Sequence, residues 1–206
     1  MQLRGDSPEA LMWDIVTNAV QYTPQSGHRV LDLGAHHAYF STYCAVRGAI
    51  VKAYEPLKEN YDHAIETLNR AAVRGSVELI NRAVWPQPTT RIWKNPDNTG
   101  ASTTGEVGDV VECDTLHQAL GGKVWNCVKV DIEGAERVIF RDLPKEDFSL
   151  IRYLTMEMHL HAMTREEEND LIGILRQGFS NVNAVIEEIN PENVGRCRVV
   201  FCSQEK

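Results

Sequence analysis

Residues 28–41 limit the possible folds of this protein more than any other segment; they read His-Arg-Val-Leu-Asp-Leu-Gly-Ala-His-His-Ala-Tyr-Phe-Ser. A β-branched apolar run leads to Asp32 and Gly34, and a helix-forming segment begins shortly afterwards. This pattern predicts a strand, a tight turn and a helix N-terminus. Unpaired N–H groups and the positive end of the helix dipole favour a carboxylate or a phosphate at such a turn. Because Gly34 has no Cβ, a ligand could come close to its backbone.

A second strand pattern supplies a carboxylate beside this turn. Residues 50–54 are apolar and β-branched and run into Glu55 and Pro56. A carboxylate at the end of the strand next to the first can accept hydrogen bonds from the two hydroxyls of a ribose. We therefore expect the two strand ends to hold one nucleoside between them.

Strand and helix patterns alternate along the rest of the chain. Apolar runs predict further strands at residues 77–80, 106–113, 125–130, 150–158, 182–187 and 196–202. Helices are expected at residues 39–47, 57–72, 114–120 and 164–177. The alternation predicts an α/β fold: a single doubly wound, mostly parallel sheet with helices on both faces and a C-terminal antiparallel hairpin.

Two segments are expected to lie beside this sheet. Ser7-Pro8-Glu9 is typical of a helix start, so residues 1–27 are expected to form an N-terminal helical segment packed on one domain of residues 28–206. That helix either closes over a ligand pocket or covers an edge of the sheet. Residues 85–105 are turn-rich and polar, which predicts a long loop that either grips a substrate or is only a flexible surface loop.

Composition narrows the class of protein. The chain of 206 residues is long enough for one domain with a sizeable core. The net charge of −8 and the singly dispersed Lys and Arg residues weigh against a nucleic-acid partner. No apolar run approaches the ~20 residues of a membrane span, and the N-terminus lacks the layout of a signal peptide, so we expect a cytoplasmic location. Five cysteines without Cys-x-x-Cys spacing favour buried free thiols.

Three ordered segments resemble the signatures of FkbM-type S-adenosylmethionine-dependent methyltransferases. They are Val30-Leu-Asp-Leu-Gly-Ala-His, Tyr54-Glu-Pro followed by Asn60, and Val128-Lys-Val-Asp-Ile-Glu-Gly-Ala-Glu136. The third is the most specific, because Lys-x-Asp-x-Glu-Gly-Ala-Glu is rare outside that family, whereas a Gly-containing strand–turn–helix is weak evidence by itself. The resemblance covers about residues 28–160 and implies a class I methyltransferase fold with S-adenosylmethionine as cofactor. The family usually has Asn in place of His36 and Gly in place of Ala38.

The strand ends and the resemblance together give the expected cofactor site. Its residues are Asp32, Gly34, Ala35, His36, Tyr39, Phe40, Glu55, Pro56, Asn60, Asn81, Ala83 and Asp131. Among these, His36 either donates a hydrogen bond to the methionine carboxylate or is a partly exposed turn residue. A zinc role for it is not expected, because no other ligand has suitable spacing.

A lysine and an aspartate share one side of the strand at residues 125–130. A lysine inside a buried strand is costly unless it is paired, so Lys129 and Asp131 are expected to reach a site at the strand's C-terminal end. Alternatively, Lys129 only pairs with a carboxylate for stability. Glu133 is expected to face a substrate or a metal, whereas Glu136 is expected to cap the next helix or to pair with a base.

The strand at residues 150–158 places Glu157 on the side of Asp131, with His159 just beyond it. Acids and a histidine there could hold a divalent cation, His159 could be a general base, or the groups could only close the pocket wall. The expected catalytic residues are thus Lys129, Asp131, Glu133, Glu157 and His159. A metal is not expected; its ligands, if any, would be Asp131, Glu157 and His159.

The leading hypothesis is methyl transfer to a hydroxyl of a small molecule or sugar. A non-catalytic accessory protein that binds S-adenosylmethionine and a methyltransferase acting on RNA remain as alternatives. A nicotinamide-dependent oxidoreductase is disfavoured because Gly34-Ala-His-His-Ala-Tyr39 does not fit Gly-x-Gly-x-x-Gly. The acceptor and the oligomeric state are not predicted by the sequence.

Overall fold

The computed structural model describes residues 21–93, 103–104, 108–187 and 197–204. The helix expected near the N-terminus, up to about Val20, lies outside the described residues, as does most of the expected loop beyond Trp93. The signatures at residues 30–36, 54–60 and 128–136 all lie within the described part of the chain.

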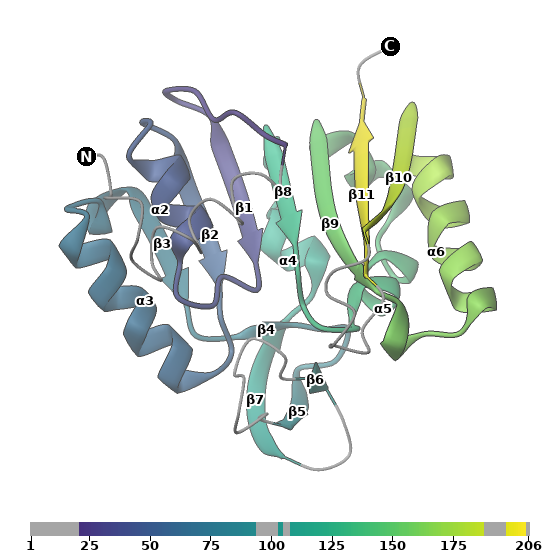
Figure 1. Cartoon of the computed structure of the whole chain (residues 1–206), viewed down its shortest axis with the longest axis horizontal. Coiled ribbons are helices and arrows are strands. Elements are labelled where there is room, and N and C mark those ends of the chain that lie inside the picture. Colours follow the sequence, from purple (N-terminus) through teal and green to yellow (C-terminus); the bar gives the residue numbers. More distant parts are fainter. Residues whose placement is uncertain (1–20, 94–102, 105–107, 188–196, 205–206) are drawn as a thin grey trace.

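A seven-stranded sheet forms the centre of the molecule, in the order β10-β11-β9-β8-β1-β2-β3 (Figure 1). Its strands are β1 Arg29–Leu33, β2 Ile50–Tyr54, β3 Val77–Ile80, β8 Cys127–Val130, β9 Tyr153–His159, β10 Asn181–Glu187 and β11 Cys197–Ser203. In this sheet β11 runs antiparallel to both of its neighbours, and the other pairings are parallel. The predicted mostly parallel sheet with a C-terminal antiparallel hairpin is confirmed.

The strand order reverses between β1 and β8. The chain moves outward from β1 through β2 and β3, and it returns to β8 on the other side of β1 before moving outward to β9. Asp32 of β1 therefore lies opposite Ala53 of β2 and Lys129 of β8. Open α/β sheets bind ligands outside the carboxyl ends of the strands at such a reversal, which brings the residues after β1, β2, β8 and β9 to one edge.

Helices cover both faces of the sheet (Figure 1). One face carries α2 Tyr39–Ala45 and α3 Lys58–Arg70, and the other carries α4 Leu116–Leu120, α5 Glu136–Arg141 and α6 Arg165–Gly178. Short 3-10 helices are η1 Arg74–Ser76, η3 Lys145–Leu150 and η4 Leu160–Ala162. Side chains alternate along β1, so that Val30 packs in the cluster with α2 and α3 while Leu31 packs in the cluster with α4 to α6. The predicted doubly wound fold is confirmed.

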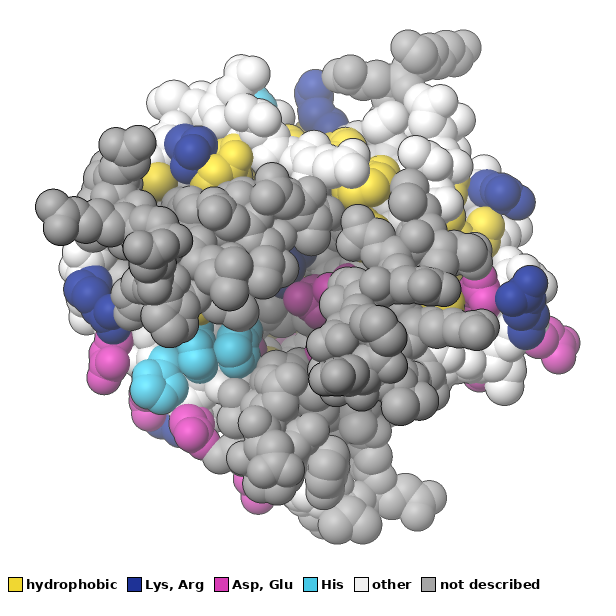
Figure 2. Space-filling view, viewed as in Figure 1, with side chains coloured by type: hydrophobic (Ala, Val, Ile, Leu, Met, Phe, Trp, Pro, Cys, Tyr) yellow, Lys and Arg dark blue, Asp and Glu magenta, His cyan; other side chains and the backbone are white. Residues whose placement is uncertain are grey.

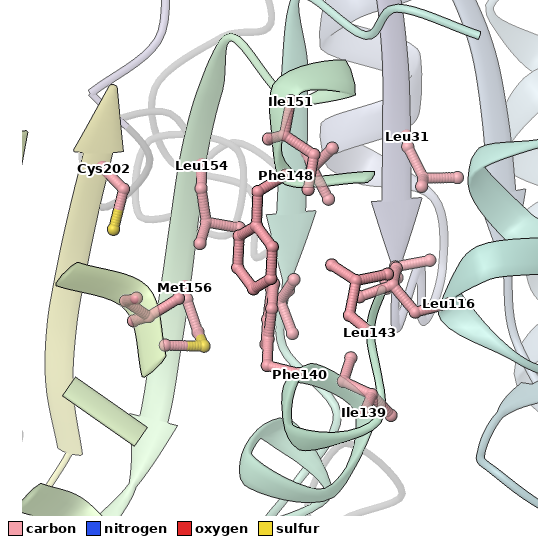
Figure 3. Packing of buried hydrophobic residues seen from close by; sticks show 14 of the residues in the cluster. Leu31, Leu116, Ile139, Phe140, Leu143, Phe148, Ile151, Leu154, Met156 and Cys202 are labelled. Carbon is pink, nitrogen blue, oxygen red and sulfur yellow. The ribbon is translucent and has the colours of Figure 1, made fainter. Parts of the chain in front are cut away.

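Aromatic side chains pack the face that carries α5 and α6 (Figure 3). The ring centroids of Phe140 and Phe148 lie 6.2 Å apart, and Phe148 meets Phe179 edge-on at 5.7 Å. A Cβ added at Gly178, the last residue of α6, would come within 2.0 Å of the Phe148 ring. The strand expected from residue 150 begins only at Tyr153, because the residues before it form η3, which carries Phe148 into the core.

A second, four-stranded sheet lies at the carboxyl edge of the main sheet (Figure 1). Its order is β4-β7-β5-β6, with bounds β4 Ala83–Val84, β7 Asp109–Asp114, β5 Thr89–Trp93 and β6 Thr103–Thr104. The sequence predicted β7 but treated β5 and β6 as loop, which is wrong. The prolines around Trp85 masked a short strand whose partner is distant in sequence: Thr89 pairs with Glu112 and Ile92 with Asp109.

Two further expectations concern membranes and thiols. None of the helices among the described residues combines the length and the apolar character that a bilayer span requires. Cys44, Cys113, Cys127 and Cys202 are buried free thiols, as the sequence predicts for them.

Candidate active site

The turn after β1, which we call the cofactor turn (residues 34–38), packs tightly against its neighbours. Gly34 has a φ of +81°, and a Cβ there would lie 1.8 Å from the backbone oxygen of Asp131. The N–H groups of Gly34 and Ala35 donate to the carbonyl of Tyr54 at 3.1 and 2.8 Å. Gly34 is therefore required by the contact between the cofactor turn and the end of β8. These two N–H groups hold the turn to β2, so they are separate from the unpaired amides that the sequence predicts at the start of the following helix.

Glu55 joins the ends of β1 and β2. Its side chain is buried, and its Oε2 accepts from the N–H of His36 at 2.8 Å. Its Oε1 accepts from the N–H of Leu57 at 2.9 Å and from Nδ2 of Asn60 at 3.4 Å. Burial raises the pKa of Glu55 to about 7, although these hydrogen bonds and the charge of Lys129 oppose the rise. The carboxylate lies where the sequence predicts it, at the end of β2 beside the cofactor turn.

The residues after β3 close the same side of the site. Asn81 donates from Nδ2 to the backbone oxygens of Glu55 and Pro56, both at 2.9 Å, so it fixes the segment that carries the carboxylate. Asn60 is buried, and its amide oxygen has no hydrogen-bond partner among the described residues. Ala83 begins β4 and packs in a small apolar cluster with Leu57.

Other predicted cofactor residues differ in their access to the site. Ala35 and Phe40 are buried in the cluster with α2 and α3, so the ring of Phe40 packs inside the protein. Tyr39, the first residue of α2, is half-buried, and its ring meets that of His37 edge-on at 6.0 Å. The structure therefore brings Tyr39 to the surface of the cofactor turn and Phe40 into the core.

Histidine rings gather beside the cofactor turn, and Figure 2 shows histidine side chains grouped on this face. The rings of His36 and His37 stack with centroids 3.8 Å apart, and His63 of α3 lies 5.0 Å from His37. Burial, and then the charge of His37, lowers the pKa of His36 to about 4. His36 is therefore neutral at pH 7 and keeps one ring N–H to donate. The sequence did not point to His63, because only the packing of α3 brings it to this turn.

Lys129 of β8 lies beneath the cofactor turn between two carboxylates. Its Nζ donates to the carbonyl of Gly34 at 3.0 Å and lies 3.4 Å from Oδ1 of Asp32 and 3.3 Å from Oδ2 of Asp131. Asp32 is fully buried and also accepts from Oγ of Ser41 at 2.7 Å. Burial lowers the pKa of Lys129, but the charges of Asp131 and Asp32 outweigh burial and leave that pKa above its ordinary value. Lys129 is thus a buried cation that orients the two aspartates.

A group that we call the acidic cluster lies at the ends of β8 and β9; it consists of Asp131, Glu133, Glu136, Glu157 and His159. Nε2 of His159 lies 3.3 Å from Oε2 of Glu133, 3.9 Å from Oδ1 of Asp131 and 4.0 Å from Oε1 of Glu157. Its Nδ1 lies 2.8 Å from Oε1 of Glu136. Three of the predicted catalytic carboxylates thus surround the predicted, buried His159 imidazole, while Lys129 reaches this group through Asp131.

The carboxylates determine the charge state of the acidic cluster. Burial lowers the pKa of His159, but hydrogen bonds and charges from Glu133 and Glu136 outweigh burial and raise that pKa to about 12. Burial opposes the charged form of Asp131 as well and so raises its pKa. The charges of Lys129 and His159 outweigh this effect and bring the pKa of Asp131 below its ordinary value. Ligand atoms of Asp131, Glu133 and His159 all lie within 4.8 Å of one another. The compact triad thus contains Glu133, where the sequence suggested Glu157 as the possible ligand.

Glu136 is the residue whose role the sequence least revealed. It was expected to cap α5 or to pair with a base, and it does pair with a base, His159, which lies 23 positions away. Its Oε1 also accepts from the N–H of Gly134 at 3.1 Å. The sequence does contain a possible signal for this contact, namely the motif Glu-Gly-Ala-Glu followed by a histidine at the end of the next strand. The motif alone does not show that the second glutamate contacts this histidine, because the two meet only in the folded protein.

A polar network that the sequence did not point to ties the small sheet to this edge. Arg82 donates to Oδ1 of Asp114 and to Oε2 of Glu112, both at 2.6 Å, and the hydroxyl of Tyr54 donates to Oδ2 of Asp114 at 2.9 Å. These contacts join the end of β2 and the start of β4 to β7. The small sheet is therefore anchored beside the cofactor side of the site.

Comparison with known families gives one match for most of the chain. The family model described as Methyltransferase FkbM domain matches residues 32–189, which include Asp32, Glu55, Lys129 and the acidic cluster. None of the curated proteins matches the chain in sequence.

Solved methyltransferase structures share this fold. The precorrin-6Y C5,15-methyltransferase of Geobacter metallireducens GS-15 is 11% identical, with a TM-score of 0.57 over 100% of this chain and 94% of that one. The methyltransferase domain of METTL16 is 11% identical, with a TM-score of 0.57 over 95% and 67%. The protein Atu636 from Agrobacterium tumefaciens, described as a predicted O-methyltransferase, is 14% identical, with a TM-score of 0.55 over 91% and 79%. The likeness is one of fold, that of class I methyltransferases.

Proposed function

The chain belongs to the FkbM family of S-adenosylmethionine-dependent methyltransferases, and we propose that it methylates a hydroxyl oxygen of a small molecule or sugar. One observation carries this proposal. Glu55 and the cofactor turn on one side, and the acidic cluster on the other, meet at the carboxyl edge of the sheet where the strand order reverses. Lys129 connects the two sides, since it contacts both Gly34 and Asp131.

The residues of the first side fit S-adenosylmethionine. Glu55 directly follows β2 and can accept from ribose hydroxyls through its remaining lone pairs. The buried amide oxygen of Asn60 beside it lacks a hydrogen-bond partner among the described residues. His36 and Tyr39 would hold the methionine end, and Asn81 with the backbone at Ala83 would hold the adenine. When bound, the cofactor supplies a methyl group on a sulfonium, which needs no further activation.

The residues of the second side would then orient the acceptor and take its proton. In the reaction the acceptor oxygen forms a bond to the methyl carbon while the bond from that carbon to sulfur breaks, and the hydroxyl proton leaves to a base. We assign the base to Glu157, a carboxylate on β9 whose side chain is 30% exposed beside His159. Lys129 holds Asp131 and the cofactor turn in place, as a positioning residue.

A polyanionic acceptor such as RNA fits this site less well. Phosphate binding relies on clustered Lys and Arg, whereas the chain has a net charge of −8 and the site carries the acidic cluster. Figure 2 shows acidic side chains in the recessed middle of this face. A neutral hydroxyl compound is the acceptor class that we propose.

Methyl transfer from labelled S-adenosylmethionine to a cell extract tests the proposal. We expect label in the small-molecule fraction with the wild-type protein and with His117→Gln, which changes an exposed histidine of α4 that pairs with Asp147 of η3, and at least a tenfold loss with Glu55→Ala. Label in the RNA fraction would overturn the acceptor class. Binding of S-adenosylhomocysteine without transfer to any fraction would favour an accessory protein and contradict the proposal.

A further inference from the structure

The acidic cluster has the composition of a cation site as well as of a proton-transfer site. Asp131, Glu133 and His159 each offer one ligand atom, and these atoms lie within 4.8 Å of one another. Adjacent ligands of an octahedral ion with bonds of ~2.1 Å lie about 3 Å apart, and opposite ones about 4.2 Å apart. Small side-chain rotations would therefore bring the three atoms to coordination distance. Asp131 and Glu133 have side chains that are 32% and 19% exposed, so an ion could enter from solvent.

Glu136 provides an independent sign that this is a built site. It is fully buried, and its Oε2 has no hydrogen-bond partner among the described residues. Its Oε1 contacts Nδ1 of His159 and accepts from the N–H of Gly134. Glu136 thus fixes both the turn that carries Glu133 and the ring of His159, and Nε2 faces the other carboxylates. Metal-bound histidines are commonly held by a carboxylate on their second nitrogen in this manner.

The balance of charge points the same way. Lys129 is shared by Asp32 and Asp131, and His159 is shared by Asp131, Glu133, Glu136 and Glu157. Two basic groups thus lie among five carboxylates, of which Asp32 and Glu136 are fully buried. Like charges at such distances repel strongly at low dielectric, so an added divalent cation would lower the electrostatic energy of the cluster.

We propose that Asp131, Glu133 and His159 form a binding site for one divalent cation of the Mn²⁺ type, with Glu136 as the residue that positions His159. Two carboxylates and one imidazole suit a cation of intermediate hardness that also keeps water or substrate oxygen as ligands. Metal ligands must be deprotonated, so the cation takes the place of a proton on His159. A role in holding the acceptor hydroxyl rests on the proposed function, but binding of the cation does not.

Titration of chelator-treated full-length protein with MnCl₂, followed by the electron paramagnetic resonance signal of free Mn²⁺, tests the site without any cofactor. We expect one equivalent of bound Mn²⁺ for the wild-type protein, and at least tenfold weaker binding for Glu133→Gln and for Asp131→Asn. Glu136→Gln should weaken binding by about 10- to 100-fold through the loss of orientation of His159. His117→Gln, which removes the exposed partner of Asp147, should bind as the wild type does.

Circular dichroism of each variant shows whether it is folded, and Glu133→Gln keeps the test informative because that side chain is not fully buried. Absence of saturable Mn²⁺ uptake by the wild-type protein would overturn the inference, as would equal uptake by the wild type and folded Glu133→Gln. Methyl transfer by chelated protein at the full rate would leave the proposed function intact and remove the catalytic role of the cation. Uptake of Mn²⁺ without methyl transfer would support the site and contradict the proposed function.

Discussion

The cofactor turn and the acidic cluster lie at the same edge of the sheet but are built from different interactions. The cofactor turn is held mainly by backbone N–H groups, which meet the carbonyl of Tyr54 and the single buried carboxylate of Glu55. The acidic cluster is held by side-chain charges around His159. Backbone hydrogen bonds fix geometry without net charge, whereas a charged cluster keeps its geometry only while its charges are balanced. We infer that the cofactor side is preformed, whereas the geometry of the acceptor side depends on the protons and ions that balance its charges.

Lys129→Met should give the largest loss of stability, because Lys129 is the cation between the two regions. Removing one partner of a buried ion pair costs about 3–5 kcal/mol, since the remaining charges are left uncompensated. Denaturant unfolding of the variant should show a loss of this size. The double variant Lys129→Met/Asp32→Asn should recover part of it, and a single variant as stable as the wild type would show that the pairs with Asp32 and Asp131 contribute nothing.

Gly34→Ala should give the second-largest loss of stability, because it disturbs the contact between the cofactor turn and the end of β8. A Cβ there would lie 1.8 Å from the backbone oxygen of Asp131, and overpacking together with a left-handed φ should cost about 2–4 kcal/mol. Gly27→Ala is the matched control, since Gly27 has the same φ of +81° and nothing within 4 Å of an added Cβ. Equal losses in the two variants would mean that the contact with Asp131 is unimportant.

The pH dependence of S-adenosylhomocysteine binding tests the cofactor side specifically. Burial raises the pKa of Glu55 to about 7, and protonation removes an acceptor for the ribose. The ionised form predominates above pH 7, so affinity should fall as the pH falls, by about tenfold for each unit below 7. Calorimetry between pH 5 and pH 8 measures this slope. Glu55→Gln should show weak binding that hardly varies with pH, and an equally steep slope in that variant would assign the effect to another group.

Asn81→Ala should have the smallest effect of these changes. It removes two hydrogen bonds, to the backbone oxygens of Glu55 and Pro56, and each typically contributes about 1 kcal/mol or less at a partly exposed position. We expect the free energy of unfolding to fall by about 1 kcal/mol. Urea unfolding measures it, and a loss larger than that of Gly34→Ala would reverse the order of importance that we assign to backbone packing and side-chain bridges.

The sequence predicted the parts of the fold that depend on local patterns. The apolar run before Asp32 and Gly34, the helical pattern of residues 164–177 and the alternation around Lys129 each indicate an element from neighbouring residues, and each element is present. The pairing of Thr89 with Glu112 depends on residues far apart in the chain. The periodicity of apolar residues within a short segment does not reveal a distant pairing partner, and for this reason residues 89–93 were expected to be a loop.

The same distinction holds for the site. Glu55 and Lys129 could be placed because each follows or lies within a recognisable strand pattern. Three contacts arise from packing between elements: that of Glu136 with His159, that of the His63 ring with the His37 ring, and those of the Gly34 and Ala35 amides with the Tyr54 carbonyl. A sequence indicates which groups lie at a strand end, but not which of them satisfy one another there.

We propose that one adenosine moiety lies against the cofactor turn and the Glu55 carboxylate, which are joined by the hydrogen bond from the His36 N–H, and that the cofactor sulfur faces the acidic cluster. A crystal structure of the protein with S-adenosylhomocysteine tests this most directly. We expect ribose hydroxyls within hydrogen-bonding distance of the Glu55 carboxylate and the sulfur on the side of Asp131. A nucleoside bound elsewhere, with Glu55 still contacting only His36, Leu57 and Asn60, would contradict it.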